Sequence, residues 1–548
     1  MAAQIFFCKA RALRVFGVSP KTMGLVKNWG EAPEKQEEMQ MKKRILALLL
    51  ALVMIVGMLP TVALAADEAE PVEVVDGAQT EQVEPSDAAE DPETEPEPEV
   101  TGEPSEDNVP AATKLDAISE QAADGGEITV YADAKEPTKV GNVYQISEEA
   151  ELIWFRNAVN GGQSAIDAVL TANITLTEEN WTPIGTSSKS YAGTFDGNGK
   201  TISGLNIVAS TQYQGLFGYV KGGTIKNLTV EGTVQTSTSR AAGIVGYGNQ
   251  VTMANCTNEA TVTSTAGGVA GVIAYALSGS SLTNCENKAT VKGSGDNVGG
   301  VVASASSATL TQCVNSGTVE NSGTPGSVNY FTGGVAASVS SKSTVTQCFN
   351  TGTVTSTLKR AGGIAGALGA STITACFNTG DITGIYETGG IAGGINTAGS
   401  VIENCYNWGK VTCVQPTKIY NDKSSTKGVG GIVGNPTSNT YTATVKNCYN
   451  AGELTNNGTE FAIGGVIGSS TGINYGSTAE NVITATNCYY LSGTAATGDG
   501  ANGSGTITAK MEAELKSADM VDDLGGSYIA QKDGYPILGW QDPNATYK

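Results

Sequence analysis

The chain has 548 residues, of which 70 are glycine and only 16% are charged, and it has a formal net charge of −22 without a single histidine. Abundant glycine with little charge favours many short strands joined by tight turns. The lack of histidine excludes His-ligated zinc proteases, Ser–His–Asp hydrolases and Cys–His proteases, whereas glycosidases that use only carboxylates are not excluded. The acidic balance argues against nucleic acid as a partner.

The N-terminal region has the pattern of an export signal. Residues 41–44 (MKKR) are basic, residues 45–59 are apolar, and small residues precede Ala66. This predicts a signal peptide over 41–65, cleaved near Ala65, with residues 1–40 as an upstream extension outside the mature protein. A membrane-spanning helix is the alternative, but the apolar run is short and an acidic segment follows. We expect a secreted or cell-surface protein with no membrane span in the mature chain.

An acidic stretch follows the predicted signal peptide. Residues 66–110 hold 17 Asp and Glu, seven prolines and no Lys or Arg. Such a segment cannot bury a core, so we expect a disordered, extended linker over 66–112. Calcium loading by the acidic run is the alternative.

Residues 113–204 are predicted to hold an N-terminal capping region and the first coils of a repeat. Residues 147–160 (SEEAELIWFRNAVN) have the pattern of an amphipathic helix with Ser147 as its N-cap. Residues 195–199 (FDGNG) are expected to form a tight turn between strands.

The chain is periodic over 205–505, where cysteines recur most often every 28 or 29 residues. After each cysteine the pattern has period two, as in Cys376, Asn378, Gly380 and Ile382, which predicts one face of a strand. The phase breaks before the cysteine, so we expect a bulge or corner there. Asparagine, which tolerates such backbone angles, often occupies this position. These residues are Asn255, Asn284, Asn404, Asn447 and Asn487.

Three short strands and three bends in about 28 residues predict one coil of a parallel β-solenoid, with strands of successive coils about 4.8 Å apart. About ten such coils fit the repeat. A β-propeller is the alternative, but its blades need four strands and around 40 residues. The fold expected is therefore all-β, a parallel β-helix with short capping helices at both ends, since solenoids must hide their ends.

The recurring cysteines are predicted to form an inward column that packs as small hydrophobes, because Leu228 occupies the same position one coil earlier. Disulfides are the first alternative, but in-register side chains point the same way and not at each other. A metal column is the second, but no CxxC spacing is present. The column comprises Cys256, Cys285, Cys313, Cys348, Cys376, Cys405, Cys448 and Cys488, whereas Cys413 stands outside it as a free or pairing thiol.

An asparagine two residues after most of these cysteines recurs in the same way. Stacked amides can hydrogen-bond along the solenoid axis and need no ligand. The series is Asn258, Asn287, Asn315, Asn350, Asn378, Asn407 and Asn450.

The residue directly after each cysteine points outward, and in the last five coils it is aromatic. This aromatic ladder consists of Phe349, Phe377, Tyr406, Tyr449 and Tyr489, with Trp408 on the same face. Stacked cross-strand aromatics stabilise a sheet by themselves. Alternatively, the ladder is a platform on which sugar rings or another protein stack. Insertions at 320–332, 413–428 and 469–483 lengthen corners of the same coils and are candidate binding loops.

No catalytic or metal-binding residues are predicted, and no cofactor. Carboxylates in these coils are scattered and differ in phase, and hydrolysis needs two of them at a defined separation. They are Asp381, Glu387, Glu403, Asp422, Glu453 and Glu460.

The C-terminal region, 506–548, is predicted to close the solenoid. Residues 508–526 have the pattern of a helix stopped by glycine, followed by a docking segment, GYPILGWQ, at 534–541.

The repeat GGIAG…ITACFNTGDITG, together with 181–208 and GYPILGWQ, resembles the GLUG motif of bacterial surface proteins over about 140–541. The resemblance implies a secreted or surface-exposed right-handed β-helix from a Gram-positive bacterium. Some relatives carry an immunoglobulin-A-cleaving metallopeptidase domain, but this chain has no HExxH and no histidine. The resemblance therefore implies no protease activity and supplies no catalytic residues.

Three functions remain open from the sequence. The first is non-catalytic binding of glycan, or of a host or bacterial surface protein, as in an adhesin. The second is a polysaccharide-active glycosidase or lyase, and the third is a purely structural spacer.

Overall fold

A computed structural model describes residues 133–323, 330–414, 428–437, 440–457, 462–470, 482–500 and 505–547. The chain divides into two compact units, Met1–Ser119 and Glu120–Lys548, and every described residue belongs to the second. The predicted upstream extension, signal peptide and acidic linker lie outside the described residues. Within the described ranges, no helix is long and apolar enough to cross a membrane.

The first full coils consist of long strands that show the repeat register directly. Strands β5 (Thr194–Ala209), β7 (Thr224–Thr236) and β10 (Thr252–Ser264) pair in parallel. Cys256 lies opposite Leu228, and Val262 lies opposite Val234. The 28-residue step in the sequence is therefore the step from one coil to the next.

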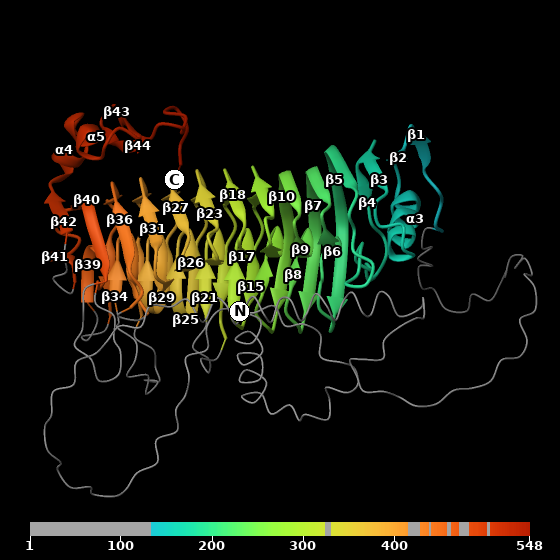
Figure 1. Cartoon of the computed structure of the whole chain (residues 1–548), viewed down its shortest axis with the longest axis horizontal. Coiled ribbons are helices and arrows are strands. Elements are labelled where there is room, and N and C mark those ends of the chain that lie inside the picture. Colours follow the sequence, from blue (N-terminus) through green and yellow to red (C-terminus); the bar gives the residue numbers. More distant parts are fainter. Residues whose placement is uncertain are drawn as a thin grey trace, which may run out of the picture. The chain divides into compact units, whose positions relative to one another are not determined.

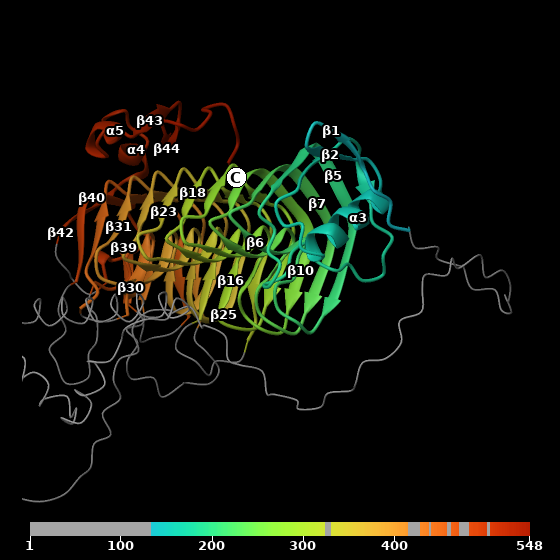
Figure 2. The ribbon, with the colours of Figure 1, turned by 45° about the vertical axis from the view of Figure 1, so that its right-hand side comes forward.

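Each later coil is built from short strands that stack in parallel on their counterparts in the neighbouring coils (Figures 1 and 2). The stack ahead of the cysteines continues from β10 through β13 (Ser281–Thr283), β18 (Thr309–Thr311), β23 (Thr344–Thr346), β27 (Thr372–Thr374), β31 (Ser400–Glu403), β36 (Ala443–Lys446), β40 (Ile483–Leu491) and β42 (Gly505–Lys510). The stack after the cysteines holds β14 (Glu286–Asn287), β19 (Val314–Asn315), β24 (Phe349–Asn350), β28 (Phe377–Asn378), β32 (Tyr406–Asn407) and β37 (Tyr449–Asn450).

Three further stacks complete the coil. The third holds β15 (Val291–Gly293), β20 (Val319–Asn321), β25 (Val354–Gly362), β29 (Ile382–Gly389), β33 (Val411–Cys413) and β38 (Leu454–Asn456). The fourth holds β8 (Ala241–Ala242), β11 (Val269–Ala270), β16 (Asn297–Gly299), β21 (Phe331–Gly333), the ends of β25 and β29, β34 (Gly428–Gly430), β39 (Ala462–Ile467) and β41 (Thr497–Asp499). The fifth holds β6 (Phe217–Lys221), β9 (Val245–Asn249), β12 (Ile273–Leu277), β17 (Val302–Ser306), β22 (Ala336–Ser340), β26 (Ala365–Gly369), β30 (Ala392–Thr397) and β35 (Val433–Pro436).

The predicted all-β parallel β-helix is confirmed, but the number of strands in a coil differs from the prediction. Two of the three expected strands are each divided by a glycine bend. A Cβ atom on Gly380 would lie 2.0 Å from the Gly352 carbonyl oxygen, and one on Gly363 would lie 2.2 Å from the Gly390 oxygen. At these bends the backbone of one coil lies so close to that of a neighbouring coil that only glycine fits.

The corner predicted before each cysteine is confirmed. At this position the residue adopts a left-handed conformation in coil after coil, with φ between 50° and 55°. Asparagine is the commonest occupant because its short amide tolerates this conformation. The residues are Asn227, Asn255, Asn284, Gln312, Gln347, Ala375, Asn404, Asn447 and Asn487.

The asparagines after the cysteines form a continuous buried row of amides. In each bond the Nδ2 of one coil donates to the Oδ1 of the next, over 2.7–2.8 Å from Asn258 to Asn450. The same Nδ2 also donates to a backbone carbonyl two residues ahead, as Asn378 does to Gly380 at 2.8 Å. Side chains that carry both donor and acceptor thus satisfy one another in the core.

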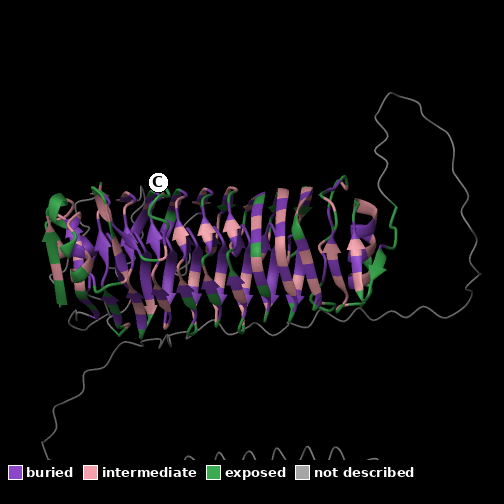
Figure 3. Cartoon of the chain, turned by 90° about the horizontal axis from the view of Figure 1, so that it is seen from above, coloured by how far each residue is buried: buried purple, intermediate pink, exposed green. Residues whose placement is uncertain are grey.

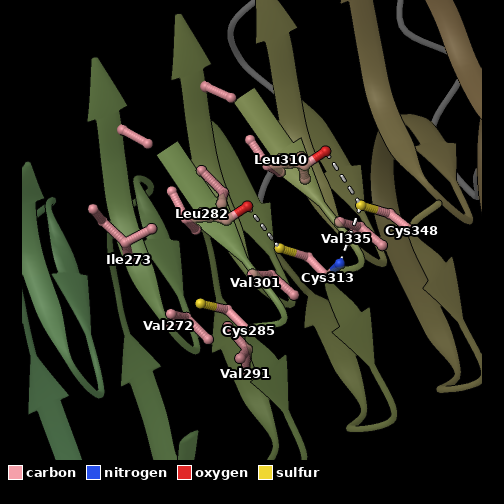
Figure 4. Close-up of a cluster of buried hydrophobic side chains, with 14 of the residues drawn as sticks. Val272, Ile273, Leu282, Cys285, Val291, Val301, Leu310, Cys313, Val335 and Cys348 are labelled. Carbon is pink, nitrogen blue, oxygen red and sulfur yellow. Dashed lines mark hydrogen bonds between the residues drawn. The ribbon is translucent and has the colours of Figure 1, made fainter. Parts of the chain in front are cut away.

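The eight thiols of the predicted column are buried and unpaired, and they hydrogen-bond as well as pack (Figure 4). The Cys313 backbone N–H donates to the Cys348 Sγ at 3.3 Å, while the Cys348 thiol donates to the Leu310 carbonyl at 3.7 Å. Sulfur therefore supplies an acceptor to a buried N–H that a leucine would leave without one. Cys413 ends β33 away from the column, where it is buried and its thiol donates to the Tyr386 carbonyl at 3.7 Å.

The N-terminal end of the solenoid is closed by helix α3 (Glu149–Asn160), whose Leu152, Phe155 and Val159 are fully buried. The N-cap is Glu148, one residue after the predicted Ser147, whose N–H and hydroxyl both donate to the Glu151 carboxylate, at 2.8 and 2.9 Å. Strand β1 (Thr138–Val140) pairs antiparallel with β2 (Val143–Ile146), β2 pairs in parallel with β3 (Asp167–Leu170), and β3 and β4 (Ile174–Thr175) join β5.

Two local predictions are wrong. Residues 195–199 do not join two strands but lie inside β5, where Asn198 takes the left-handed corner conformation.

Residues 508–526 are not one helix. Their first residues belong to β42, because the open edge of β40 offers hydrogen-bonding partners and Thr506, Ile507 and Thr508 are β-branched. Two short helices, α4 (Glu512–Leu515) and α5 (Asp519–Asp523), follow, and then a hairpin of β43 (Tyr528–Gln531) and β44 (Gly534–Leu538).

The replacement Asn378→Asp should destabilise the solenoid by about 3 kcal/mol or more, because a buried carboxylate would face the Gly380 carbonyl and the Asn407 Oδ1 without a donor. Urea denaturation followed by circular dichroism measures the change. The control is Asn284→Asp, which makes the same substitution in the exposed outer row of amides and should cost less than about 1 kcal/mol. Equal losses in both variants would contradict the role of the buried row.

Stability should fall at alkaline pH. Burial raises the pKa of the Cys413 thiol to about 12 and raises the pKa values of Cys488 and Tyr528. The unfolded chain ionises its cysteines near pH 8.5 and its tyrosines near 10, so the folded state binds more protons above pH 8.5. The urea midpoint, measured with a reductant present, should hold steady up to about pH 8 and then decrease through pH 9 and 10.5. An unchanged midpoint at pH 10.5 would contradict this.

Candidate functional site

The predicted aromatic ladder forms on the outer face of the cysteine wall, with its rings stacked from coil to coil. Ring centroids are 4.7 Å apart for Phe349–Phe377, 5.0 Å for Phe377–Tyr406 and 5.3 Å for Tyr406–Tyr449, with planes within 18° of parallel. The Trp408 indole N–H donates to the Tyr449 hydroxyl at 2.8 Å. The sequence therefore placed these residues correctly in one row.

The ladder is covered by the chain's own C-terminal segment, residues 511–547, drawn in red in Figures 1 and 2. The segment and the ladder share one hydrophobic cluster, in which Leu515, Met520, Leu524 and Leu538 are buried. Trp540 lies 5.9 Å from the Phe377 ring, and its indole N–H donates to the Ala375 carbonyl at 3.0 Å.

Polar contacts hold the cover in register. The Tyr406 hydroxyl bonds with the Gln541 side chain at 3.0 Å, the Tyr449 hydroxyl donates to the Pro536 carbonyl, and the Tyr528 hydroxyl donates to the Asn447 carbonyl at 2.9 Å. Every one of these partners is buried, so each bond replaces one to water.

The prediction that the ladder is an open binding platform is therefore corrected. Phe377, Tyr406 and Tyr449 are fully buried, whereas Phe349, Trp408 and Tyr489 keep only partial exposure. The large apolar area of the rings has been removed from water by an intramolecular partner. The predicted docking role of GYPILGWQ fits this arrangement, since Pro536, Leu538 and Trp540 all belong to the cover.

The scattered carboxylates do not assemble into a catalytic pair within the described residues. Glu387 is buried against Arg360, Glu403 pairs with Lys446 at 3.2 Å, and Glu453 pairs with Lys410 at 3.0 Å. The Asp381 carboxylate accepts the Lys410 backbone N–H at 3.1 Å. Asp422 and Glu460 lie outside the described residues, and among those described no cluster of Cys, Asp and Glu could hold a metal ion.

A second row of aromatic side chains lies on the outer face of the fifth stack. Tyr219, Tyr247 and Tyr275 occupy the same position in successive coils. Their centroids are 4.4 and 6.1 Å apart, with planes within 25° of parallel, and Tyr213 meets the first two edge-on. Tyr213, Tyr219 and Tyr275 are partly exposed, whereas Tyr247 is 5% exposed between them.

Arg240 lies over this row. Its guanidinium carbon is 5.3 Å from the centroids of Tyr213 and Tyr275 and 5.6 Å from that of Tyr247. The corner directly before β8 aims the side chain there, because Arg240 has a φ of 68° and its N–H donates to the Gly268 carbonyl at 2.9 Å. We call Tyr213, Tyr219, Arg240, Tyr247 and Tyr275 the tyrosine patch.

The matching corner in the next coil leaves room for the patch. Gly268 occupies the position of Arg240 and also has a left-handed backbone, with φ 69°. A Cβ atom there would lie 3.0 Å from the Tyr275 ring and 3.2 Å from its hydroxyl. Glycine thus allows Tyr275 to lie flat in the row.

Two polar atoms at the patch are shielded from water and have no hydrogen-bond partner among the described residues: Arg240 Nε and Asn297 Oδ1. Burial raises the pKa of the Tyr275 hydroxyl, while the neighbouring Arg240 lowers it, so the phenol stays protonated at neutral pH. The patch therefore brings stacked rings, a cation and phenol hydroxyl groups together.

The patch was missed in the sequence although a signal exists. Tyr219, Tyr247 and Tyr275 are spaced by 28 residues, the same step as the cysteines, in the stretches FGYV, VGYG and IAYA. Arg240 likewise precedes its Gly-containing run as Arg360 does, in RAAGI and RAGGI.

The comparisons with known proteins are weak. No protein-family model and no curated protein matches the chain. Among solved structures, a Bacteroides ovatus protein described as a "putative immunoglobulin A1 protease" shares 18% identity over 73% of this chain and 93% of that chain, with a TM-score of 0.31. An IgA1 protease shares 12% identity over 67% of this chain and 21% of that chain, with a TM-score of 0.26. Scores at this level carry no argument about function, and the resemblance to the GLUG family stays a prediction.

Replacement of Trp540 by Ala should release the C-terminal segment from the ladder. The variant loses a partly buried ring and the hydrogen bond to Ala375, about 3 kcal/mol of docking energy, which exposes the stacked rings. Limited proteolysis should cut within 511–547 at least tenfold faster, and binding of a hydrophobic dye should increase. The control is Val208→Ala, at an exposed apolar position on β5. Identical cleavage rates in both variants would contradict the covering role.

Proposed function

We propose that this protein is a secreted or surface-exposed, non-catalytic β-helix that binds carbohydrate through the tyrosine patch. The observation that carries the proposal is the stacked row of Tyr219, Tyr247 and Tyr275 beneath Arg240, in which Tyr219 and Tyr275 are partly exposed. The exposed parts of these rings and their hydroxyl groups suit the apolar C–H groups and the hydroxyl groups of a sugar ring. Export rests on the predicted signal peptide over 41–65, and the linker over 66–112 would hold the solenoid away from its point of attachment.

A carbohydrate suits the exposed surface better than a protein partner does. Stable protein interfaces need a contiguous apolar core of several hundred Å². Among the described residues, the large hydrophobic side chains that are exposed are Val140, Val208 and Met511, which lie far apart in the sequence. The one larger aromatic surface, the ladder, is already occupied by the C-terminal segment.

A binding role also suits the chemistry better than catalysis. Four of the carboxylates considered for hydrolysis contact lysine or arginine residues, as described above, which favours a structural role. The patch itself holds no carboxylate.

The full-length chain should bind members of a glycan array, and the Tyr275→Ala variant should lose at least about tenfold in affinity, because a partly exposed ring and its hydroxyl group are removed. Tyr441→Ala is the matched control, since Tyr441 is also partly exposed but lies outside the patch. Circular dichroism should show both variants folded. Equal affinity of the two variants would move the binding site elsewhere, and no binding to any glycan would favour a structural spacer.

A further inference from the structure

We propose that Arg240 binds a carboxylate of the ligand, so that the tyrosine patch recognises an acidic sugar such as a uronic or sialic acid residue. This inference rests on the proposed carbohydrate-binding function and names its substrate class. It comes from a comparison of the arginines within the chain.

The described residues contain three arginines, and each packs on an aromatic ring. Arg156 lies 4.6 Å from the Trp181 centroid, and Arg360 lies 5.2 Å from that of Phe331. Both also hold a carboxylate: Glu178 pairs with Arg156 at 2.5 Å, and Glu387 pairs with Arg360 across one coil. Arg240 packs on three rings, but no described carboxylate lies within ion-pair distance of it.

Arg240 and Arg360 make the comparison especially direct because they occupy the same corner of the repeat. Both have left-handed backbones, with φ of 68° and 61°, and both immediately precede the fourth-stack positions Ala241 and Ala361. In the coil after Arg360 the chain supplies Glu387. In the coil after Arg240 the corresponding residue is Gly268, which has no side chain. The carboxylate that partners Arg360 therefore has no counterpart in the coil after Arg240.

The hydrogen bonds of Arg240 leave one edge of its guanidinium unused. Nη1 donates to the Gln212 Oε1 at 3.0 Å and to the Tyr213 hydroxyl at 2.7 Å, which fixes the plane of the group over the rings. Nε has no acceptor and is shielded from water, so its unmet hydrogen bond is costly. In the proposed complex the ligand carboxylate accepts from Nη2 and, after the side chain rotates, from Nε, in the bidentate geometry that arginine favours.

Other charged groups near the patch set its selectivity. Asp296, one coil further along, acts on the Tyr275 hydroxyl, and burial raises the pKa of its carboxyl. As an anion it opposes a second negative charge close to Tyr275, which confines the ligand carboxylate to the Arg240 side of the row. Replacement Asp296→Asn should therefore strengthen binding of an acidic sugar two- to fivefold.

The test uses the full-length chain on immobilised oligogalacturonate, hyaluronan and sialylated oligosaccharides, each beside its carboxyl-reduced, neutral counterpart. We expect at least one acidic member to bind tenfold or more tighter than its reduced form, and more weakly as salt increases. Arg240→Gln should remove this difference, Arg240→Lys should restore part of it, and Lys226→Gln, the same charge change at a lysine paired with Asp196, should leave it intact.

The outcomes separate the two proposals. Equal binding of acidic and neutral members, or an unchanged preference in Arg240→Gln, would overturn the carboxylate assignment and leave the carbohydrate-binding patch standing. Binding to neither form of any member, by a chain that is folded by circular dichroism, would overturn both.

Discussion

The solenoid depends on identical side chains meeting at the same height in every coil. The buried amide row shows how strictly this holds: the coil-to-coil step in sequence varies from 28 residues between Asn350 and Asn378 to 43 between Asn407 and Asn450, yet the bond stays at 2.7–2.8 Å. Each amide needs both neighbours, so a slip of one residue would leave buried donors and acceptors unpaired in two coils. The insertions predicted as binding loops, at 320–332, 413–428 and 469–483, lie largely outside the described residues.

The cysteine column also depends on equivalent side chains meeting from coil to coil, with sulfur as the hydrogen-bonding atom. At the left-handed corner before each cysteine the strand ladder is interrupted, so the buried backbone N–H groups beside it need another acceptor. Cys348 and Cys376 supply it through Sγ to the N–H of the preceding coil, at 3.3 and 3.4 Å. The position needs an apolar side chain for the core and an acceptor for the backbone N–H. Cysteine supplies both, whereas leucine supplies only the first and serine only the second.

The same coil-to-coil stacking produces two aromatic rows on the outer surface, and the two rows differ in chemistry and in exposure. Stacked rings in the cysteine wall extend over several coils and present more apolar area than a soluble surface carries, and residues 511–547 cover it. Stacked tyrosines in the first coils carry hydroxyl groups and an arginine, so they remain compatible with water. The binding role is proposed for the second row because it combines hydroxyl groups with a cation, whereas the first row packs against residues 511–547. Figure 3 shows the repeating alternation of buried and partly exposed residues from which both rows arise.

Arginine shows how a repeat diverges without changing its backbone. The corner that holds Arg360 over Phe331 with Glu387 as partner also holds Arg240 over tyrosines, and only the residue in the following coil differs. One side chain in a neighbouring coil thus converts a buried structural ion pair into a partly exposed cation.

The sequence by itself determined the parallel β-helix, the coil length, the corner at Asn284 and its equivalents, and the row to which Phe377 and Tyr406 belong. These features arise from period and parity, which are local properties repeated along the chain. Only the tertiary structure decided that the ladder is covered, because the partners of Tyr406 and Phe377 lie more than 130 residues away in a segment outside the repeat. It also decided that residues 505–510 form a strand, since the open edge of β40 supplies hydrogen bonds that outweigh the helical pattern. The tertiary structure also decided that Arg240 has no carboxylate partner in the next coil, where Gly268 takes the place that Glu387 has beside Arg360.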